Sequence, residues 1–331
     1  SRRLGVQLSQ VGVDLAGFDQ QLILLETLGK ATATYWKWVS TGQKLTIVER
    51  LLKLAEVRQD ALKRQVEQGS SPEILLRDNM RLILSRRELL VSAEQALNEA
   101  ALQLSLFHRD REGAPIVPTR EDLPEDFPGA GGMEIALEAD LQAIPNTRPD
   151  VQFLEGLRRQ FGVEKLFGEN LGTPTLDVNV KASQDAGDPQ FYGFASETER
   201  SRNEAELGLK VSFELPVQRR KGRGEVMRTS AAIRRMDAEL MLALQTAVTE
   251  LRGAFIRLQA AEQRIDLTQE TYQLALQLEE AERRRFELGQ SNLLFVNQRE
   301  VMSANDASKV IDAQRTYQEA LALYRIARGS W

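Results

Sequence analysis

Apolar residues recur every seven positions along two long stretches of the chain, which is the spacing of coiled-coil helices. In each stretch, one line carries mostly large side chains and a second line carries mostly small ones. In the C-terminal stretch, the large line is Leu244, Leu251, Leu258, Ile265 and Tyr272, and the small line is Leu240, Ala247, Ala254, Ala261, Thr268 and Ala275. In the N-terminal stretch, the large line is Leu24, Ala31, Trp38, Leu45 and Leu52, and the small line is Thr27, Thr34, Thr41, Val48 and Ala55. Two lines per helix predict packing against two neighbours, as in a sheet or cylinder of helices, with an ordinary helical bundle as the alternative.

The distribution of proline sets the length of these helices. Six of the ten prolines lie between Pro115 and Pro149, and none follows Pro216. Because proline costs about 3 kcal/mol inside a helix, we expect one helix over residues 5–68 and another over 225–288. At 1.5 Å per residue each would span about 95 Å, which favours a coiled-coil assembly over a compact enzyme.

Each long helix is followed by a turn signal. The first is Gly69-Ser70-Ser71-Pro72 and the second is Gly289-Gln290-Ser291-Asn292. Glycine suits the position just after a helix, and serine or asparagine caps the next one. The sequence therefore predicts two helical hairpins, whose return helices run over 72–107 and 291–328.

A shift of 220 residues aligns the two hairpins without a gap. The identical pairs are Leu54/Leu274, Ala55/Ala275, Ala61/Ala281, Arg64/Arg284, Glu67/Glu287, Gly69/Gly289, Ser71/Ser291, Ala93/Ala313, Glu99/Glu319 and Ala100/Ala320. This self-similarity indicates two structural repeats in one chain.

Between the repeats, two stretches alternate strictly between apolar and polar residues, which is typical of strands with one apolar face. They cover 175–182 and 207–215 and have the length of a tilted membrane strand. A soluble ribbon over a protein core is the alternative, but a lone hairpin is marginal in water and the long helices offer it no globular core. We expect lipid-facing side chains at Leu176, Val178, Val180, Leu207, Leu209, Val211 and Phe213.

One cluster of side chains lies between these two stretches, and another follows the second stretch. The connecting segment 184–204 is polar apart from Phe191-Tyr192-Gly193-Phe194, which we interpret as an interfacial aromatic girdle or a loop contact. A basic run at Arg219, Arg220, Lys221 and Arg223 follows the second stretch. Because this run lies at the base of a membrane strand, we expect it to face lipid headgroups or the mouth of a membrane pore rather than nucleic acid.

Composition excludes several kinds of chemistry. The 331 residues include no Cys and one His, His108, which excludes disulfides, thiolate catalysis and His-pair zinc sites. A solvated residue near a helix C-terminus is a simpler interpretation of His108 than a catalytic base. A net charge of −5 argues against a general nucleic-acid binder, and no apolar run reaches the roughly 20 residues of a membrane helix. We predict no enzyme activity, no cofactor and no metal.

Four local patterns occur in order along the chain. They are Asn146-Thr147-Arg148-Pro149-Asp150, Asn170-Leu171-Gly172-Thr173-Pro174-Thr175-Leu176-Asp177, Phe213-Glu214-Leu215-Pro216-Val217 followed by Arg219-Arg220-Lys221-Gly222-Arg223-Gly224-Glu225, and Arg284-Arg285-Phe286-Glu287-Leu288-Gly289-Gln290-Ser291-Asn292-Leu293-Leu294. The order and spacing of these patterns, together with the internal repeat, resemble those of the TolC-like outer membrane efflux proteins, the channel-tunnels of Gram-negative bacteria. The resemblance covers essentially the whole chain.

The resemblance implies a mainly α fold with a β-hairpin, in which long antiparallel coiled-coil helices form a trimeric α-barrel and the strands contribute to a transmembrane β-barrel. In the family, each intact protomer gives four strands to a 12-stranded barrel. The first repeat should carry its own strand hairpin, and a shift of 220 residues would place that hairpin before Ser1. We therefore expect the chain to be N-terminally incomplete.

On this basis the chain divides into five parts. Residues 1–114 form the first helical hairpin, 115–149 an equatorial connection, 150–172 a short helix, 173–216 the transmembrane β-hairpin and 217–331 the second helical hairpin.

The resemblance places functional residues at the hairpin turns. In the family, these tips contact a periplasmic adaptor protein, although turn chemistry alone would require the same glycine and serine. The matching residues are Arg64, Gly69, Ser70, Ser71, Arg284, Glu287, Gly289, Gln290 and Ser291. Relatives carry pore-closing carboxylates just after the second tip, where this chain has Phe295-Val296-Asn297-Gln298. We therefore expect a gate of apolar or hydrogen-bonding side chains at Phe286, Phe295, Asn297 and Gln298.

The resulting functional prediction is an outer-membrane exit duct for efflux or type I secretion. It would be a passive homotrimer in outer-membrane lipid, with its helical part in the periplasm of a Gram-negative bacterium. A periplasmic adaptor and an inner-membrane transporter would open its tips, and nucleic acid is not an expected partner. A soluble, elongated coiled-coil scaffold without a pore is the alternative.

Overall fold

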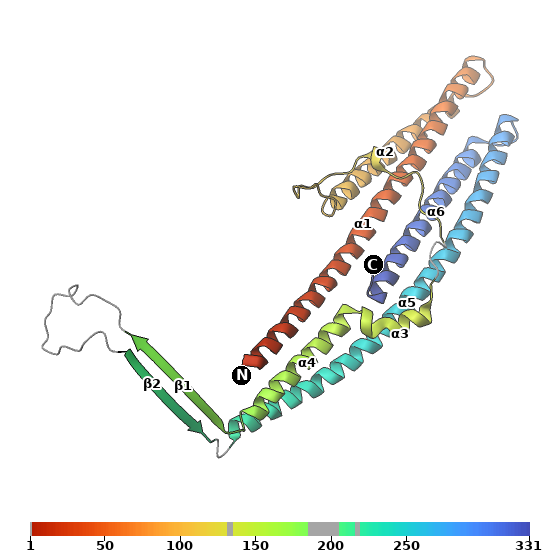
Figure 1. Ribbon diagram of the computed structural model, residues 1–331. Helices are drawn as coiled ribbons and strands as arrows, with labels where there is room; N and C mark the ends of the chain where they lie inside the picture. Colours follow the sequence, from red (N-terminus) through yellow and green to blue (C-terminus); the bar gives the residue numbers. More distant parts are fainter. Residues whose placement is uncertain (1, 131–134, 185–204, 216–218) are drawn as a thin grey trace, which may run out of the picture. The chain divides into compact units, whose positions relative to one another are not determined.

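The computed structural model describes residues 2–130, 135–184, 205–215 and 219–331, and most of them are helical (Figure 1). The helices are α1 (Arg2–Glu67), α2 (Glu73–Leu104), α3 (Leu137–Thr147), α4 (Pro149–Asn170), α5 (Arg220–Glu287) and α6 (Leu293–Arg328), with a 3₁₀ turn η1 (Arg120–Asp122). The strands are β1 (Thr175–Gln184) and β2 (Ala205–Glu214). The aromatic cluster at 191–194 lies outside the described residues.

Two compact units make up the chain. One contains the residues up to Ala16 together with Phe153–Met241, and the other contains Gly17–Gln152 and Leu242–Trp331. The first unit holds the strand pair, most of α4 and the beginning of α5. The first unit also holds the beginning of α1, and the second unit holds the rest of both helical hairpins.

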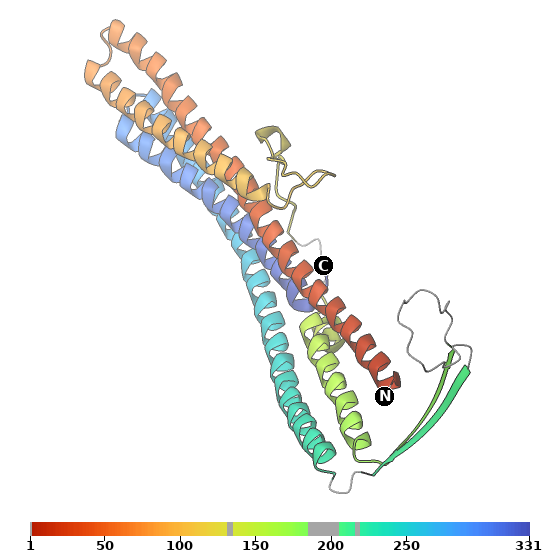
Figure 2. The ribbon, with the colours of Figure 1, turned by 90° about the vertical axis from the view of Figure 1, so that its left-hand side faces the viewer.

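The two helical hairpins are α1 with α2 and α5 with α6, and each reverses direction at a tight turn (Figure 2). Helices α1 and α5 contain 66 and 68 residues, close to the two long helices expected from the proline distribution. Helix α3 was not expected, because Pro145 lies inside it. That proline lies in the last turn of the helix, where it removes the one backbone hydrogen bond that an amide at this position would donate to Leu141.

The seven-residue lines of α5 are buried in one core. Ala247, Leu251, Ala254, Leu258 and Ala261 are at most 3% exposed. They form a cluster with small and aromatic residues of α6 and with Ile144 of α3, so large and small lines pack together rather than against separate neighbours.

A second core joins α1 and α2. Trp38, Leu45 and Leu104 are buried there, and Ile311 of α6 belongs to the same cluster. The connecting segment covers this core from outside, where Phe127 stacks on Trp36 with ring centroids 5.3 Å apart. The connection between the repeats is thus anchored by aromatic packing, although it has little regular structure.

Several large apolar side chains of α2 and α5 remain exposed. On α2 they include Met80, Leu84, Val91 and Leu102, and on α5 they include Leu242, Ile256, Leu267 and Leu274. Most are four, seven or eleven residues apart, so they continue the coiled-coil spacing on faces that the described residues do not cover.

In the first unit, α4 and α5 meet closely at the base of the strand pair. A Cβ atom added to Gly222 would lie 2.8 Å from the carbonyl oxygen of Gly168, so only glycine fits. Further along, Arg228 binds Glu164 at 2.8 Å, and Arg158 pairs with Asp237.

Candidate functional site: strand hairpin, helical tips and inter-repeat ion network

The register of the strand pair places all the apolar residues on one face. Strands β1 and β2 are antiparallel, and their pairs include Leu176↔Phe213, Val178↔Val211, Val180↔Leu209 and Ala182↔Leu207. The alternate pairs, such as Asn179↔Lys210 and Asp177↔Ser212, are polar. Because side chains alternate between faces, the seven residues expected to face lipid lie together.

This apolar face has no cover within the part of the chain that the structure describes. Its seven large side chains are 60–80% exposed, from Val178 and Val211 at 60% to Leu207 at 80%. The sheet contains only these two strands among the described residues, so both outer edges lack a paired strand. The unpaired edges of the hairpin would be satisfied by pairing with further strands. Its apolar face would be stable in an apolar environment.

The two helical tips have the same backbone structure. Gly69 and Gly289 both have φ +70°, a left-handed conformation that favours glycine. In the first tip the amide of Gly69 donates to Val66 O and that of Ser70 to Gln65 O; in the second, Gly289 donates to Phe286 O and Gln290 to Arg285 O. The 220-residue repeat therefore extends to individual hydrogen bonds.

The side chains differ between the two tips. At the first tip, the Ser71 hydroxyl donates to Gln65 Oε1 at 3.0 Å. At the second, the hydroxyl of Ser291 donates to the buried carboxylate of Glu282. Among the residues expected to contact an adaptor, Ser71 and Ser291 are partly buried, and the rest are exposed: Arg64, Gly69, Ser70, Arg284, Glu287, Gly289 and Gln290.

The structure gives the four residues expected to form a gate different surroundings. Phe295 is half exposed and lines a small hollow of about 510 Å³ with the second tip, including Arg285 and Arg299. Gln298 is exposed, and Phe286 is partly buried. Asn297 instead accepts a hydrogen bond from Arg58 Nη1 of α1 at 2.8 Å, so it connects the two repeats.

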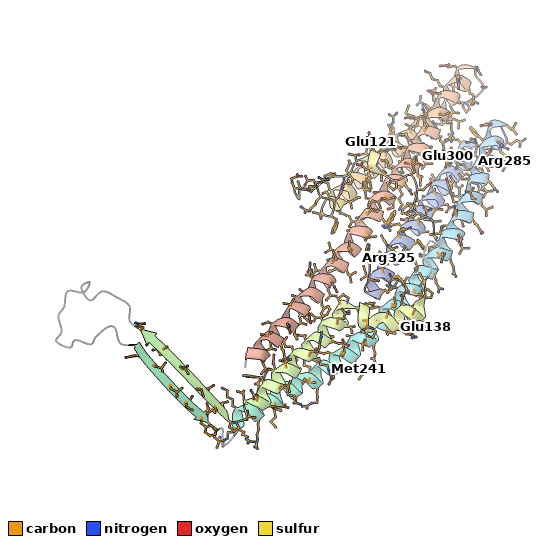
Figure 3. The ribbon with its side chains drawn as sticks, in the orientation of Figure 1. Glu121, Glu138, Met241, Arg285, Glu300 and Arg325 are labelled. Carbon is orange, nitrogen blue, oxygen red and sulfur yellow. The ribbon has the colours of Figure 1, made fainter. Side chains whose placement is uncertain are left out.

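A buried ion network lies between the repeats and was not foreseen from the sequence. Glu300 of α6 is 1% exposed, and its two carboxylate oxygens bind different arginines. Oε1 accepts from Arg58 of α1, and Oε2 accepts from Arg86 Nη2 of α2 at 2.7 Å. Figure 3 shows Glu300 on α6 and Arg285 near the tip of α5.

A second ion pair extends this network to α5. Arg50 of α1 donates through Nη2 to both carboxylate oxygens of Glu279, at 3.0 and 3.1 Å. Ser303 of α6 also donates to Glu279, which is 4% exposed. All four helices of the hairpins are therefore joined by charged groups. Burial lowers the pKa of Arg58, and the charge of Glu300 opposes that shift.

A sequence signal for this network exists, although it does not identify the partners. Glu300 shares a helical face with the buried residues Val296, Ser303 and Ala307, and Arg86 shares one with Ile83 and Leu97. A charged residue in an otherwise buried line predicts a paired charge.

The Asn146–Asp150 motif fastens the end of α6 to the junction of α3 and α4. Arg148 donates to Asp150 and to Glu250 Oε2 at 2.9 Å, and to the carbonyl of Ala327 at 3.2 Å. Thr147 Oγ1 donates to Arg328 O at 2.8 Å. Burial lowers the pKa of Arg148, but the two carboxylates raise it by more.

No helix among the described residues is long and apolar enough to cross a bilayer. Within the same residues, no three carboxylate or histidine side chains gather as a metal site would require. His108 is exposed after the end of α2.

The paired helical hairpins, matching tips and connecting strand pair define the channel-tunnel fold of the TolC-like outer membrane factors. The mainly α fold with a β-hairpin that the sequence resemblance implied is confirmed. No protein-family model and no curated protein sequence matches the chain.

Solved outer membrane channels show this fold. The CmeC channel of Campylobacter jejuni matches with a TM-score of 0.76 and 14% identity over 99% of this chain and 67% of its own. The open-state MtrE channel of Neisseria gonorrhoeae matches with a TM-score of 0.79 and 16% identity, over 99% and 71%. The outer membrane protein VceC of Vibrio cholerae matches with a TM-score of 0.74 and 14% identity, over 99% and 75%.

Proposed function

We propose that the chain is a subunit of a passive outer-membrane exit channel for efflux or type I secretion, which catalyses no reaction. The observation that carries this proposal is the strand register, which collects seven large apolar side chains on one exposed face. A membrane barrel satisfies such a hairpin, because neighbouring strands pair its edges and lipid covers its apolar face.

The channel is a homotrimer whose long helices form a tunnel in the periplasm of a Gram-negative bacterium. The exposed apolar lines of α2 and α5 support this assembly. Leu84 and Val91 on one helix, and Leu267 and Leu274 on the other, have coiled-coil spacing and need a partner helix. In a ring of identical subunits, α2 of one copy packs on α5 of the next, which leaves neither line exposed.

The helical tips contact a periplasmic adaptor protein that works with an inner-membrane transporter. Support comes from their shared backbone structure and from the exposure of Arg64, Ser70, Arg284 and Gln290. An adaptor that separates the two hairpins must break the bonds of Glu300 to Arg58 and Arg86. Closure of the pore would then depend on the side chains of Phe295, Gln298 and Phe286. Asn297 is bound by Arg58 instead.

Planar-bilayer conductance of the protein, expressed from its own gene and purified with and without detergent, tests this proposal. We expect discrete channels from a trimer that requires detergent or lipid. A monomer that stays soluble without detergent and gives no conductance would favour the coiled-coil scaffold instead.

The gate is tested in the same assay. The double variant Phe295→Ala/Gln298→Ala should raise the conductance of the closed trimer, because it removes the side chains that would fill the constriction. Leu294→Ala truncates an exposed neighbour on α6 and serves as the control. Equal conductance of both variants would place the gate elsewhere.

A further inference from the structure

Four exposed cations gather where the strand pair meets α5. Arg219 immediately precedes the helix, and Arg220, Lys221 and Arg223 lie in its first turn. Among the described residues, none of the four takes part in an ion pair, and the first turn contains no acidic residue. The positive end of the helix dipole adds to their charge.

Close packing fixes this cationic turn at the base of the hairpin. A Cβ atom on Gly222 would come within 2.8 Å of Gly168 O and 3.0 Å of Gly172 N, so the turn lies directly against the end of α4. Gly172 is three residues before β1, whose first residue Thr175 pairs with Glu214 at the end of β2. The cations are therefore held where the apolar face ends.

Nearby carboxylates do not neutralise this cluster. Glu225 is engaged by Arg228, with Nη2 2.6 Å from Oε1, and that hydrogen bond lowers the pKa of Glu225. Within the described residues, Glu169 adjoins Gly168 at the end of α4 and Glu214 ends β2, and both are exposed. Four cations against these two carboxylates leave an excess of positive charge.

Apolar surface adjoins this charge. Phe213 and Leu215, at the end of β2, are 65% and 56% exposed. A band of apolar side chains bordered by unpaired cations matches a bilayer surface, where acyl chains give way to phosphate groups. Arginine binds phosphate through two parallel hydrogen bonds, and three of the four cations are arginines.

We propose that Arg219, Arg220, Lys221 and Arg223 bind the phosphate groups of anionic phospholipids at the periplasmic surface of the outer membrane. This inference rests on the proposed function, because it requires the hairpin to be in the membrane. The bound lipid fixes the depth of the barrel and ties the start of α5 to the membrane surface.

Native mass spectrometry of the trimer, expressed from its own gene, tests the proposal. The trimer is titrated with phosphatidylglycerol and with phosphatidylcholine of the same acyl chains. We expect phosphatidylglycerol to bind at least about tenfold more tightly, because each cation near the surface contributes favourably to binding an anionic lipid. In Arg219→Gln/Arg220→Gln/Lys221→Gln/Arg223→Gln the preference should fall to within about twofold.

A matched control removes the same charge elsewhere on α5. Arg252, Arg257, Arg264 and Arg283 are exposed and make no ion pair within the described part of the chain. Their fourfold change to glutamine should keep the preference for phosphatidylglycerol. If the preference survives the first variant, or falls equally in the control, the proposal is wrong.

Two further measurements keep the outcome decisive. If the first variant does not assemble, raising salt to about 0.5 M should abolish the wild-type preference, because exposed charges are screened; a preference unchanged by salt overturns the proposal. Conductance of the same preparation separates the two proposals. A conducting trimer without lipid preference contradicts only the lipid site, whereas a protein that neither trimerises nor conducts contradicts the channel itself.

Discussion

Arg58 of α1 and Glu300 of α6 form a buried ion pair between helices that belong to different repeats. Glu300 also binds Arg86 of α2 at 2.7 Å, so one carboxylate holds two helices of the first hairpin. Removing a charge from water is costly, and such a group is stable only when its hydrogen bonds are satisfied. We therefore expect the pair to favour the alignment of the two hairpins in which both of its arginines reach Glu300.

Replacing Glu300 with glutamine should destabilise the protein by about 3 kcal/mol, because Arg58 and Arg86 would remain buried without a counter-charge. The measurement is the midpoint of urea unfolding at a fixed protein concentration. Fixed concentration is necessary because the stability of an oligomer depends on it.

Glu280→Gln is the matched control. Glu280 pairs with Arg284 on the surface of α5, where the two side chains are 50% and 71% exposed. An exposed pair one helical turn apart contributes less than about 1 kcal/mol. Equal losses in the two variants would show that burial of Glu300 does not set its contribution.

The sequence predicted the parts that depend on local rules. Seven-residue spacing and the absence of proline indicated α1 and α5, and glycine at Gly69 and Gly289 indicated their turns. Strict alternation indicated which side chains of the strands share a face, and the register confirms it. Each of these signals is carried by neighbours in the chain.

What the sequence did not indicate depends on contacts between distant segments. Glu300 meets Arg86 across 214 residues, and no local pattern identifies that partner. The position of Asn297 beside Arg58 has the same origin, so its place in a gate could not be judged from the tip sequence alone. Helix α3 was missed because six prolines between 115 and 149 suggested only irregular structure.

Gly329→Ala should destabilise the end of α6 by about 2 kcal/mol. Gly329 has φ +81°, and an added Cβ would lie 2.4 Å from the carbonyl oxygen of Thr147. The clash involves backbone, which cannot turn aside as a flexible side chain can. Gly162→Ala, within α4 and with open space around it, should instead be neutral or stabilising by up to about 1 kcal/mol. Thermal unfolding distinguishes the two, and similar shifts would contradict the packing argument.

Acid should weaken the fold partly through Asp150. Burial raises the pKa of Asp150, but the hydrogen bonds and charge of Arg148 lower it by more, so the folded-state pKa lies below its ordinary value. The stability from ionised Asp150 is therefore complete above the unfolded pKa of about 3.9 and is lost as the pH falls through the lower folded value.

Asp150→Asn should accordingly flatten the decrease in unfolding free energy below about pH 5, as measured by urea titrations at several pH values. Glu49, whose pKa is lowered chiefly by its hydrogen bond from Arg120, retains its own part of the decrease. Asp266→Asn changes an exposed aspartate that forms no ion pair among the described residues, and it should leave the profile unaltered. A wild-type profile in the Asp150 variant would rule out this contribution.

Placing a charge on the apolar face of the hairpin tests whether that face meets lipid. Val178 pairs with Val211 near the middle of the strands, and its neighbour Asn179 points to the opposite face. Val178→Lys should cost about 2–4 kcal/mol if the side chain faces the centre of the bilayer, and the amount of trimer in isolated outer membranes should fall sharply. Asn179→Lys adds the same charge to the same strand, but on the polar face, and the trimer should persist. If the two variants insert equally well, the apolar face does not contact lipid and the strand pair has another partner.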